Sequence, residues 1–368
     1  MKRNKGTILF VGGGTGGHIY PGLAVLDKMP GEYAYVWLGS RKSMDREIVE
    51  GKGIPFKAVS AGKLRRYFSL ENLVDVFKIL LGFFESLMFV ARTRPKALFS
   101  KGGYVSVPPV VAARLLKIPV ITHESDLLPG LATKINSRYA EKILVAYEES
   151  IAFFPLSIRQ KLTVAGVPIR PEVLTGDPDS GRRSLSLSSS DPILLVLGGS
   201  QGARAVNSII LNCIDKLLGY WQVIHQTGKL FSIDKEQLER LKKKGYRPAP
   251  YFGTEYPDIL AAADVVICRA GATTLWELSA VKKPSVLIPL GLGASRGDQI
   301  SNARLYYGRG ASFVLESGDG AEKDLIDLLE DLKDVTTRAK MGEMAHSLYR
   351  EDSAIFIAAE IIKSATGE

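Results

Sequence analysis

A histidine stands at the end of a glycine-rich turn near the start of the chain, where it could exchange a proton beside a bound phosphate. Gly12, Gly14 and Gly17 fit the spacing G-x-G-x-x-G after the strand-like run TILFV, and His18 follows them directly. Glycines at this spacing let the backbone approach a phosphate where a helix begins. The helix dipole disfavours the cationic form of histidine, so His18 is predicted to be neutral and able to accept a proton near pH 7. A capping or core histidine is the alternative.

The next strand-like run argues against a nicotinamide cofactor in this turn. A dehydrogenase usually places an acidic residue about twenty positions after the glycines, where it binds the ribose hydroxyls. Here the run YAYVWL leads into Gly39, Ser40, Arg41 and Lys42, with no carboxylate. An NADP-linked oxidoreductase could use the two cations for the 2′-phosphate, and this alternative stays open.

Further candidates for acid–base chemistry in the first half of the chain follow another strand-like run. The sequence ITHES places His123 and Glu124 at a strand end, where side chains point into a cleft, and FSKGGYVSVPP offers the Tyr104 hydroxyl. Glu124 is the second candidate base after His18. A structural hydrogen bond is an equally good interpretation of His123.

The second half carries residues suited to a nucleotide and a sugar. In CRAGATTLWELSA, Gly271 permits a tight turn, and the residues from Ala272 to Thr274 would form the exposed amide end of a helix, which attracts a diphosphate. Glu277, one turn further on, could accept hydrogen bonds from two ribose hydroxyls; a solvated helix glutamate is the alternative. Gln299 begins another helix, and its amide can both donate to and accept from sugar hydroxyls.

Neither a metal ion nor a cofactor nor a nucleic acid is expected. The four histidines show no helical i, i+4 pairing, and the two cysteines show no C-x-x-C. The chain has no G-x-x-x-x-G-K-[ST] motif and no helix dense in Arg and Lys beside exposed aromatic residues. Mononucleotide hydrolysis and nucleic-acid binding are therefore disfavoured.

The elements that must position these residues alternate between strands and helices throughout both halves. A chain of 368 residues exceeds one ordinary core, and each half opens with a strand that runs into glycines, LFVGGGTGG and LVLGGSQGA. This alternation predicts an α/β fold with two Rossmann-like, doubly wound parallel-sheet domains that face each other across a cleft. The Ser-rich, Gly- and Pro-containing stretch 175–192 between the halves is predicted to be a linker or surface loop.

The composition indicates a globular protein with anionic partners. The net charge is +9 and the pI is near 9.3, which fits nucleic acid, a phosphorylated substrate or an anionic membrane surface without choosing between them. Two cysteines far apart in sequence and an N-terminus without a signal-like apolar region predict a cytoplasmic location.

The segment 70–91 is the most apolar part of the chain. Charged residues interrupt it, so it has no uncharged apolar run of about 18 residues, the length needed to span a membrane. As a helix it would carry an apolar arc wider than one sheet face needs. Arg65, Arg66, Arg92 and Arg94 flank it. Two interpretations stay open, a well-buried helix and a helix that contacts an anionic membrane surface.

Five motifs in order resemble the MurG family of N-acetylglucosaminyltransferases, and they extend from residue 12 to residue 303. They are GGGTGGHIYPGLAV, SKGGYVSVPPVVAA, THESDLLPGLATK, GGSQGARAVN and CRAGATTLWELSA with the later DQISNA. The resemblance implies a GT-B arrangement and an inverting, metal-independent transfer of GlcNAc from UDP-GlcNAc to lipid I, which makes lipid II for peptidoglycan. It also implies a peripheral location at the cytoplasmic face of the plasma membrane.

The resemblance assigns roles to individual positions. Contacts to the donor fall on Thr15, Gly16, Gly17, Asp126, Arg170, Ser200, Gly253, Ala272, Thr273, Thr274, Glu277 and Gln299. Tyr104 and His123 match acceptor-binding positions, and His18 and Glu124 match catalytic positions on the acceptor side. The domains implied are 1–168 with a returning C-terminal helix at about 350–368, and 169–349.

Some positions depart from the family pattern. Asp126 and Thr133 stand where the family usually has Asn, and YFGTEYPD replaces FIDDM, which leaves Gly253 at the backbone position that faces uracil. A carboxylate beside a diphosphate is repelled unless it is paired or protonated, so Asp126 calls for a partner. A non-catalytic membrane scaffold and a UDP-sugar 2-epimerase of the same architecture are the remaining alternatives. Glu277 and Gln299 argue against the scaffold, and the chain supplies no clear pair of cleft carboxylates for the epimerase.

Overall fold

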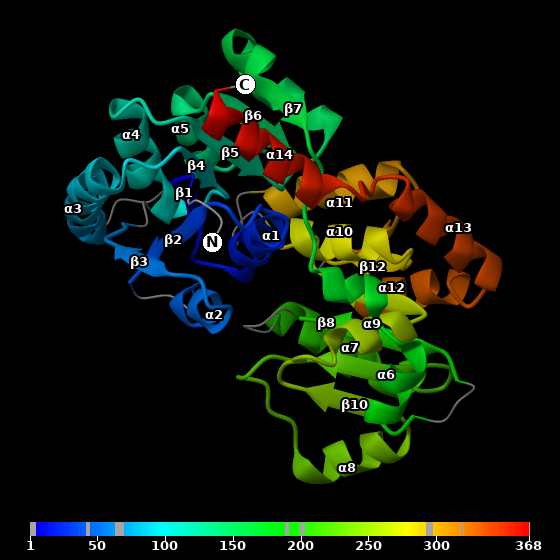
Figure 1. Cartoon of the computed structure of the whole chain (residues 1–368). Helices are drawn as coiled ribbons and strands as arrows, with labels where there is room; N and C mark the ends of the chain where they lie inside the picture. The colour runs from blue at the N-terminus through cyan, green and yellow to red at the C-terminus, as the bar shows by residue number, and fades with distance from the viewer. Residues whose placement is uncertain are drawn as a thin grey trace. The chain divides into compact units, whose positions relative to one another are not determined.

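The structure is a computed structural model that describes residues 5–41, 45–62, 70–187, 191–198, 203–291, 297–316, 318 and 320–367 (Figure 1). The chain divides into two compact units. Unit 1 comprises residues 1–169 and 350–368, and unit 2 comprises residues 170–349.

Unit 1 is built on a seven-stranded sheet in which every neighbouring pair of strands is parallel, in the order β3-β2-β1-β4-β5-β6-β7. The strands are β1 (Thr7–Val11), β2 (Ala34–Ser40), β3 (Phe56–Val59), β4 (Ala97–Ser100), β5 (Val120–Glu124), β6 (Lys142–Val145) and β7 (Leu162–Val164). The helices are α1 (Gly16–Leu26), α2 (Asp45–Gly51), α3 (Leu70–Thr93), α4 (Val107–Leu115), α5 (Leu131–Tyr139) and α14 (Ser353–Thr366), with 3-10 helices at Tyr104–Ser106, Glu148–Phe153 and Leu156–Lys161.

Both faces of this sheet are buried, which is why its strands read as continuous apolar runs. Alternate residues of β1 enter different cores. Ile8 and Phe10 pack with residues of α1 and α14, whereas Leu9 and Val11 pack with residues of α3 and α4. The strand order reverses at β1, between β2 and β4, and the crevice at such a switch point is where ligands bind in open α/β sheets.

Unit 2 repeats this design with a six-stranded parallel sheet in the order β10-β9-β8-β11-β12-β13. The strands are β8 (Ile193–Leu197), β9 (Gln222–Gln226), β10 (Tyr246–Ala249), β11 (Val265–Cys268), β12 (Ser285–Leu287) and β13 (Phe313–Val314). The helices are α6 (Pro178–Ser184), α7 (Arg204–Leu217), α8 (Lys235–Lys243), α9 (Tyr256–Ala262), α10 (Ala272–Ala280), α11 (Asp298–Gly308), α12 (Ala321–Asp331) and α13 (Val335–His346), with a 3-10 helix at Pro171–Thr175. The prediction of two doubly wound parallel sheets is confirmed.

Part of the predicted linker at 175–192 is helical. Asp177 caps α6 by accepting hydrogen bonds from the N–H groups of Asp179 and Ser180, and α6 packs against α9 within unit 2. The sequence did not reveal this helix, because Asp177 followed by Pro178 is typical both of a turn and of a capped helix start.

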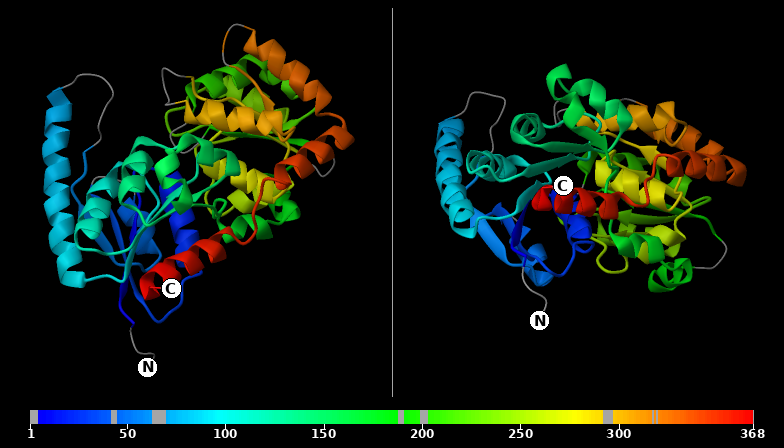
Figure 2. Two further views of the ribbon diagram at one scale, coloured as in Figure 1. Left: turned by 90° about the horizontal axis from the view of Figure 1, so that it is seen from above. Right: turned by 45° about the horizontal axis from the view of Figure 1, so that its top comes forward.

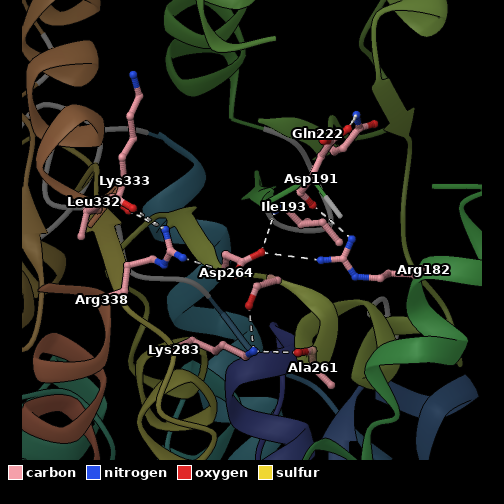
Figure 3. Close-up of polar contacts among 11 residues, drawn as sticks. Arg182, Asp191, Ile193, Gln222, Ala261, Asp264, Lys283, Leu332, Lys333 and Arg338 are labelled. Atoms are coloured by element: carbon pink, nitrogen blue, oxygen red, sulfur yellow. Dashed lines mark hydrogen bonds and ion pairs between the residues drawn. The ribbon is translucent and has the colours of Figure 1, made fainter. Parts of the chain in front are cut away.

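Charged residues at the amino end of the second sheet serve the fold. Figure 3 shows Asp264, which accepts a hydrogen bond from the Ile193 N–H at 2.8 Å and pairs with Arg182 and Arg338, each at 3.8 Å. Lys283 donates to the carbonyl oxygens of Ala261 and Ala263, and burial lowers the pKa of its ammonium group to about 8. These groups fix the starts of β8 and β11, the two strands at the switch point of unit 2.

Helix α3 exposes its apolar side. Phe77, Phe84 and Met88 are 64%, 59% and 60% exposed, whereas Asp75 and Ser86 are buried. The inward side of α3 also carries Glu85, which accepts a hydrogen bond from the Ser60 N–H at 2.7 Å. In both views of Figure 2, α3 lies along the outside of unit 1. The interpretation of segment 70–91 as a well-buried helix is therefore wrong, because its polar stripe faces the protein.

Candidate functional site

The glycine turn after β1 is held in place by a buried carboxylate that the sequence did not indicate. Gly14 has a φ of +89°, and its N–H donates to Asp45 Oδ1 at 3.0 Å. A Cβ atom at Gly13 would lie 2.0 Å from Asp45 Oδ2, so a side chain at that position would collide with the carboxylate. Asp45 begins α2, 31 residues after Gly14, and this separation explains why spacing arguments missed it.

His18 lies where this turn meets the turn after β4. Thr15 is the N-cap of α1 and has an extended conformation. Its side chain makes no hydrogen bond to the first N–H groups of the helix. His18 is the third residue of α1. A Cβ atom at Gly103 would lie 2.6 Å from the Gly13 carbonyl oxygen and 3.2 Å from the His18 ring. Gly103, with a φ of +78°, thus allows the close approach of the two turns around His18.

Tyr104 borders the same turn. A Cβ atom at Gly14 would lie 2.9 Å from the Tyr104 ring, so this glycine leaves the space that the ring occupies. The structure therefore brings together three sequence-predicted elements: the start of α1 at Thr15, Gly16 and Gly17, the His18 imidazole, and the Tyr104 ring.

Glu124 has a different environment from the one expected of a base. It is buried at the end of β5, and its two oxygens accept four hydrogen bonds. Oε1 accepts from the N–H groups of Ser125 and Asp126, and Oε2 accepts from the Gly130 N–H and the Thr133 hydroxyl. A carboxylate engaged in this way orders the loop before α5 and has little capacity left for a substrate proton.

Lys101 is a buried cation that the sequence analysis missed although it lies within the motif SKGGYV. Its side chain is 2% exposed, and Nζ donates to Ser125 Oγ at 2.7 Å. Burial lowers the pKa of the Lys101 ammonium group to about 8, while the charges of Glu124 and Asp126 act in the opposite direction. Lys101 thus supplies a positive charge near Asp126, the carboxylate for which the sequence had indicated no partner.

The buried ammonium group predicts a pH-dependent stability. Because the pKa of Lys101 is lower in the folded protein than the ordinary 10.5, the unfolded chain binds more protons between about pH 8 and 10.5. The cost of burying the charge is fully present below about pH 8 and disappears as the pH rises. Relative to Lys101→Met, the wild-type protein should gain roughly 3 kcal/mol of unfolding free energy between pH 7 and 10.5. Urea unfolding of both proteins across this range measures the difference, and a constant difference would disprove the assigned environment.

His123 makes the structural hydrogen bond that the sequence left open. The ring is fully buried, and Nε2 lies 2.7 Å from the Gly166 carbonyl oxygen, which requires a proton on Nε2. Burial, with the Lys101 charge as a smaller cause, holds the pKa of His123 well below its ordinary value of 6.5. A neutral imidazole that orients the end of β5 is the role these contacts support.

In unit 2, the first turn of α10 is open to an anion. Gly271 is the N-cap, with an extended conformation and no side-chain cap bond, and the predicted residues Ala272, Thr273 and Thr274 form the first turn. Uncapped N–H groups and the helix dipole favour a phosphate at this position. Arg269, in the turn just before the N-cap, is partly buried, and burial lowers the pKa of its guanidinium group.

Glu277 is buried and ion-paired, so the interpretation as a solvated helix glutamate is wrong. Arg170 donates from Nε to Oε1 at 2.8 Å and from Nη2 to Oε2 at 3.0 Å. Tyr256 donates its hydroxyl to Oε2 at 3.1 Å, and its ring lies 4.6 Å from the Arg170 guanidinium carbon. Burial, and then the charge of Glu277, raises the pKa of Tyr256 well above 10, so the hydroxyl keeps its proton.

The remaining donor residues have simpler surroundings. Gln299 lies in the first turn of α11, and its Oε1 accepts a hydrogen bond from the Leu290 N–H at 3.1 Å. Asn302, which the sequence analysis did not single out, donates to the Ala270 carbonyl oxygen and so holds α11 to the turn before α10. Gly253 is exposed, in the loop before α9. Ser200 lies outside the residues that the structure describes.

Within the described parts of the chain, no group of three His, Cys, Asp or Glu side chains is arranged to hold a metal ion. Both cysteines, Cys213 and Cys268, are buried and free.

Comparison with known proteins finds one family over most of the chain. Residues 8–145 match the glycosyltransferase family 28 N-terminal domain, and residues 193–356 match the glycosyltransferase family 28 C-terminal domain. A protein of Treponema denticola is 42% identical over 97% of both chains, and one of Clostridium kluyveri is 40% identical over 94% of this chain and 96% of its own. Both are named UDP-N-acetylglucosamine–N-acetylmuramyl-(pentapeptide) pyrophosphoryl-undecaprenol N-acetylglucosamine transferase.

Solved structures share the fold at lower identity. The crystal structure of MurG from Acinetobacter baumannii aligns with a TM-score of 0.75 at 24% identity, covering 97% of this chain and 99% of the other. A UDP-GlcNAc 2-epimerase from Neisseria meningitidis, crystallised with UDP-GlcNAc, aligns with a TM-score of 0.65 at 12% identity, covering 97% of this chain and 100% of the other.

Proposed function

The chain belongs to glycosyltransferase family 28, and we propose that it transfers GlcNAc from UDP-GlcNAc to the C4 hydroxyl of MurNAc in lipid I, which forms lipid II. The relatives that carry this activity in their names match the chain over nearly its full length. The observation that carries the proposal in the structure is the open start of α10 followed one turn later by the buried carboxylate Glu277. A diphosphate and a ribose, joined as in a nucleotide sugar, need these two groups in that order.

Unit 2 binds the donor. The N–H groups of Ala272, Thr273 and Thr274 receive the diphosphate, Glu277 binds the ribose hydroxyls, and Gln299 contacts the GlcNAc hydroxyls. Arg170, which is paired with Glu277 of α10, supplies a positive charge next to the donor site. Gly253 presents its backbone to uracil, and Ser200 is assigned a further contact to the donor.

Unit 1 binds the acceptor and carries the base. The C4 hydroxyl attacks the anomeric carbon, His18 accepts its proton, and the configuration changes from α to β. Tyr104 helps to position the acceptor, whereas the fully buried His123 acts on it only through the end of β5. Thr15, Gly16 and Gly17 are assigned to the donor. The departing UDP gains negative charge, and each preorganised N–H donor that meets this charge typically lowers the barrier by about 3 kcal/mol.

Helix α3 places the enzyme on an anionic membrane surface, where its lipid acceptor lies. Its outward aromatic and aliphatic side chains have no protein covering them among the described residues, and the exposed Arg92 and Arg94 follow them. Arg114 and Lys117 of the neighbouring α4 region line an open cavity of about 590 Å³ together with Leu115. Apolar side chains bordered by cations suit the boundary of anionic headgroups and acyl chains.

No helix in the described parts of the chain is long and apolar enough to span a membrane. We place the protein at the cytoplasmic face of the plasma membrane as a peripheral protein.

Charges on the outer side of α3 should release the protein from vesicles. Phe77→Glu with Phe84→Glu should weaken binding to phosphatidylglycerol-containing vesicles by about tenfold or more, because burial of each phenylalanine stabilises the bound state. The control is Leu156→Glu, which changes a side chain that is 77% exposed elsewhere in unit 1 and should bind normally. Sedimentation with vesicles measures the effect. Equal binding of all three proteins would contradict the membrane assignment.

Donor recognition separates two residues. Glu277→Ala should weaken UDP binding by about tenfold or more, because hydrogen bonds to a carboxylate are lost. Gln299→Ala should leave UDP binding unchanged and reduce the preference for UDP-GlcNAc over UDP-glucose. Calorimetry with the three ligands tests both expectations, and unchanged affinity and preference in both variants would reject the donor assignment.

A further inference from the structure

The Glu277 carboxylate is already occupied in this structure. Two N–H groups of Arg170 and the hydroxyl of Tyr256 donate to its two oxygens. A carboxylate offers about four lone-pair sites, and a ribose diol would add two further donors. Three donors and two hydroxyls together exceed the sites available, so the diol and the full Arg170 contact exclude each other.

We propose that Arg170 occupies the ribose site of the empty protein and moves from Glu277 to the donor diphosphate when a nucleotide binds. The inference rests on the proposed function of Glu277 as the ribose-binding residue. It makes Arg170 a residue whose effect on binding changes sign with the ligand. Arg170 opposes a ligand that has a ribose alone and favours a ligand that also carries phosphate.

The geometry supports this exchange. Glu277 is three residues after Thr274, so a rise of about 4.5 Å along α10 separates the two, and the Arg170 side chain can span that distance. The Arg170 side chain is 26% exposed, whereas that of Glu277 is 3% exposed, so the arginine is the partner with room to move. The donor diphosphate, its new partner, carries more negative charge than the Glu277 carboxylate that it leaves.

Tyr256 keeps the carboxylate in position during the exchange. Its hydroxyl is protonated, and its bond to Oε2 does not involve Arg170. With Arg170 gone, one donor and two ribose hydroxyls fit within the four lone-pair sites. The tyrosine ring also packs against the guanidinium group in this structure, which favours the pairing of Arg170 with Glu277.

The test compares uridine with UDP by calorimetry at one ionic strength. Arg170→Met keeps an apolar stem over Tyr256 and removes the donors. It should bind uridine about threefold more tightly than the wild-type protein and UDP about tenfold more weakly, because the competitor and the phosphate partner are lost together. Arg170→Lys should recover part of the UDP affinity.

Arg240→Ala is the matched control. Arg240 pairs with Asp215 through two bonds of 2.8 and 3.0 Å, the same lengths as in the Arg170 pair, but it donates from Nη1 and Nη2 and lies on the surface of unit 2. Both ligands should bind this variant as they bind the wild type. Thermal unfolding of each variant detects a loss of structure.

The outcomes separate the two proposals. If Arg170→Met changes the affinities for uridine and UDP in the same direction, or changes neither, the exchange is wrong while the donor site stands. If the wild-type protein binds no UDP, the proposed function itself fails and the exchange fails with it.

Discussion

His18→Ala is expected to lower turnover by about 10² to 10⁴-fold while donor affinity changes little, because a positioned general base contributes a factor of this size. His18 lies in the first turn of α1, against Gly103 of a second glycine turn, and the proposal gives it the proton of the acceptor hydroxyl. The acidic limb of the pH–rate profile should also disappear, since that limb reports protonation of the base. Single-turnover kinetics with a lipid I analogue, together with UDP calorimetry, measure both quantities.

A variant that keeps the size of the imidazole strengthens this experiment. His18→Gln retains polarity without a basic nitrogen and should lose as much turnover as His18→Ala. If either variant keeps near wild-type turnover, His18 is a structural residue of the first glycine turn and the base must be sought elsewhere.

Glu124→Ala is expected to destabilise the protein by about 3 to 5 kcal/mol, because it removes a buried carboxylate that compensates a buried cation. Three hydrogen bonds to the loop before α5 and one to Thr133 within α5 are lost, and Lys101 loses a neighbouring negative charge. Urea unfolding measures the change. Glu50→Ala, which breaks a surface pair with Arg46 in the same unit, should change stability by no more than about 0.5 kcal/mol.

Glu124→Gln distinguishes a loop anchor from a base. The amide replaces one accepting oxygen by a donor that faces N–H groups and a hydroxyl, so this variant should also be less stable. A Glu124→Gln protein with wild-type stability and a turnover reduced by more than about 100-fold would instead identify Glu124 as the base.

The sequence predicted the parts of the fold that depend on local pattern. Alternating apolar runs and helical stretches indicated parallel sheets, and both glycine turns, after β1 and before α10, lie where their motifs placed them. These features are predictable because strand period, glycine spacing and helix starts are set within a few residues.

The contacts that define the candidate site are between residues far apart in sequence, so they could not be read from spacing. Asp45 is 31 residues from Gly14, Lys101 is 24 residues from Ser125, and Arg170 is 107 residues from Glu277. Periodicity predicted a wide apolar arc on α3 but not that this arc faces outward. The hydrogen bond from Ser60 to Glu85 fixes that orientation, and it joins residues 25 positions apart.

The most direct test of the proposed activity follows radiolabelled UDP-GlcNAc with a lipid I analogue in the presence of EDTA. We expect label in a β-linked disaccharide lipid, with an equal amount of UDP released, and only when the acceptor is present. Turnover should survive EDTA, because helix N–H groups and arginine provide the positive charge that meets the leaving group. Formation of a UDP-sugar epimer without acceptor, or a turnover that EDTA abolishes and magnesium restores, would contradict the account.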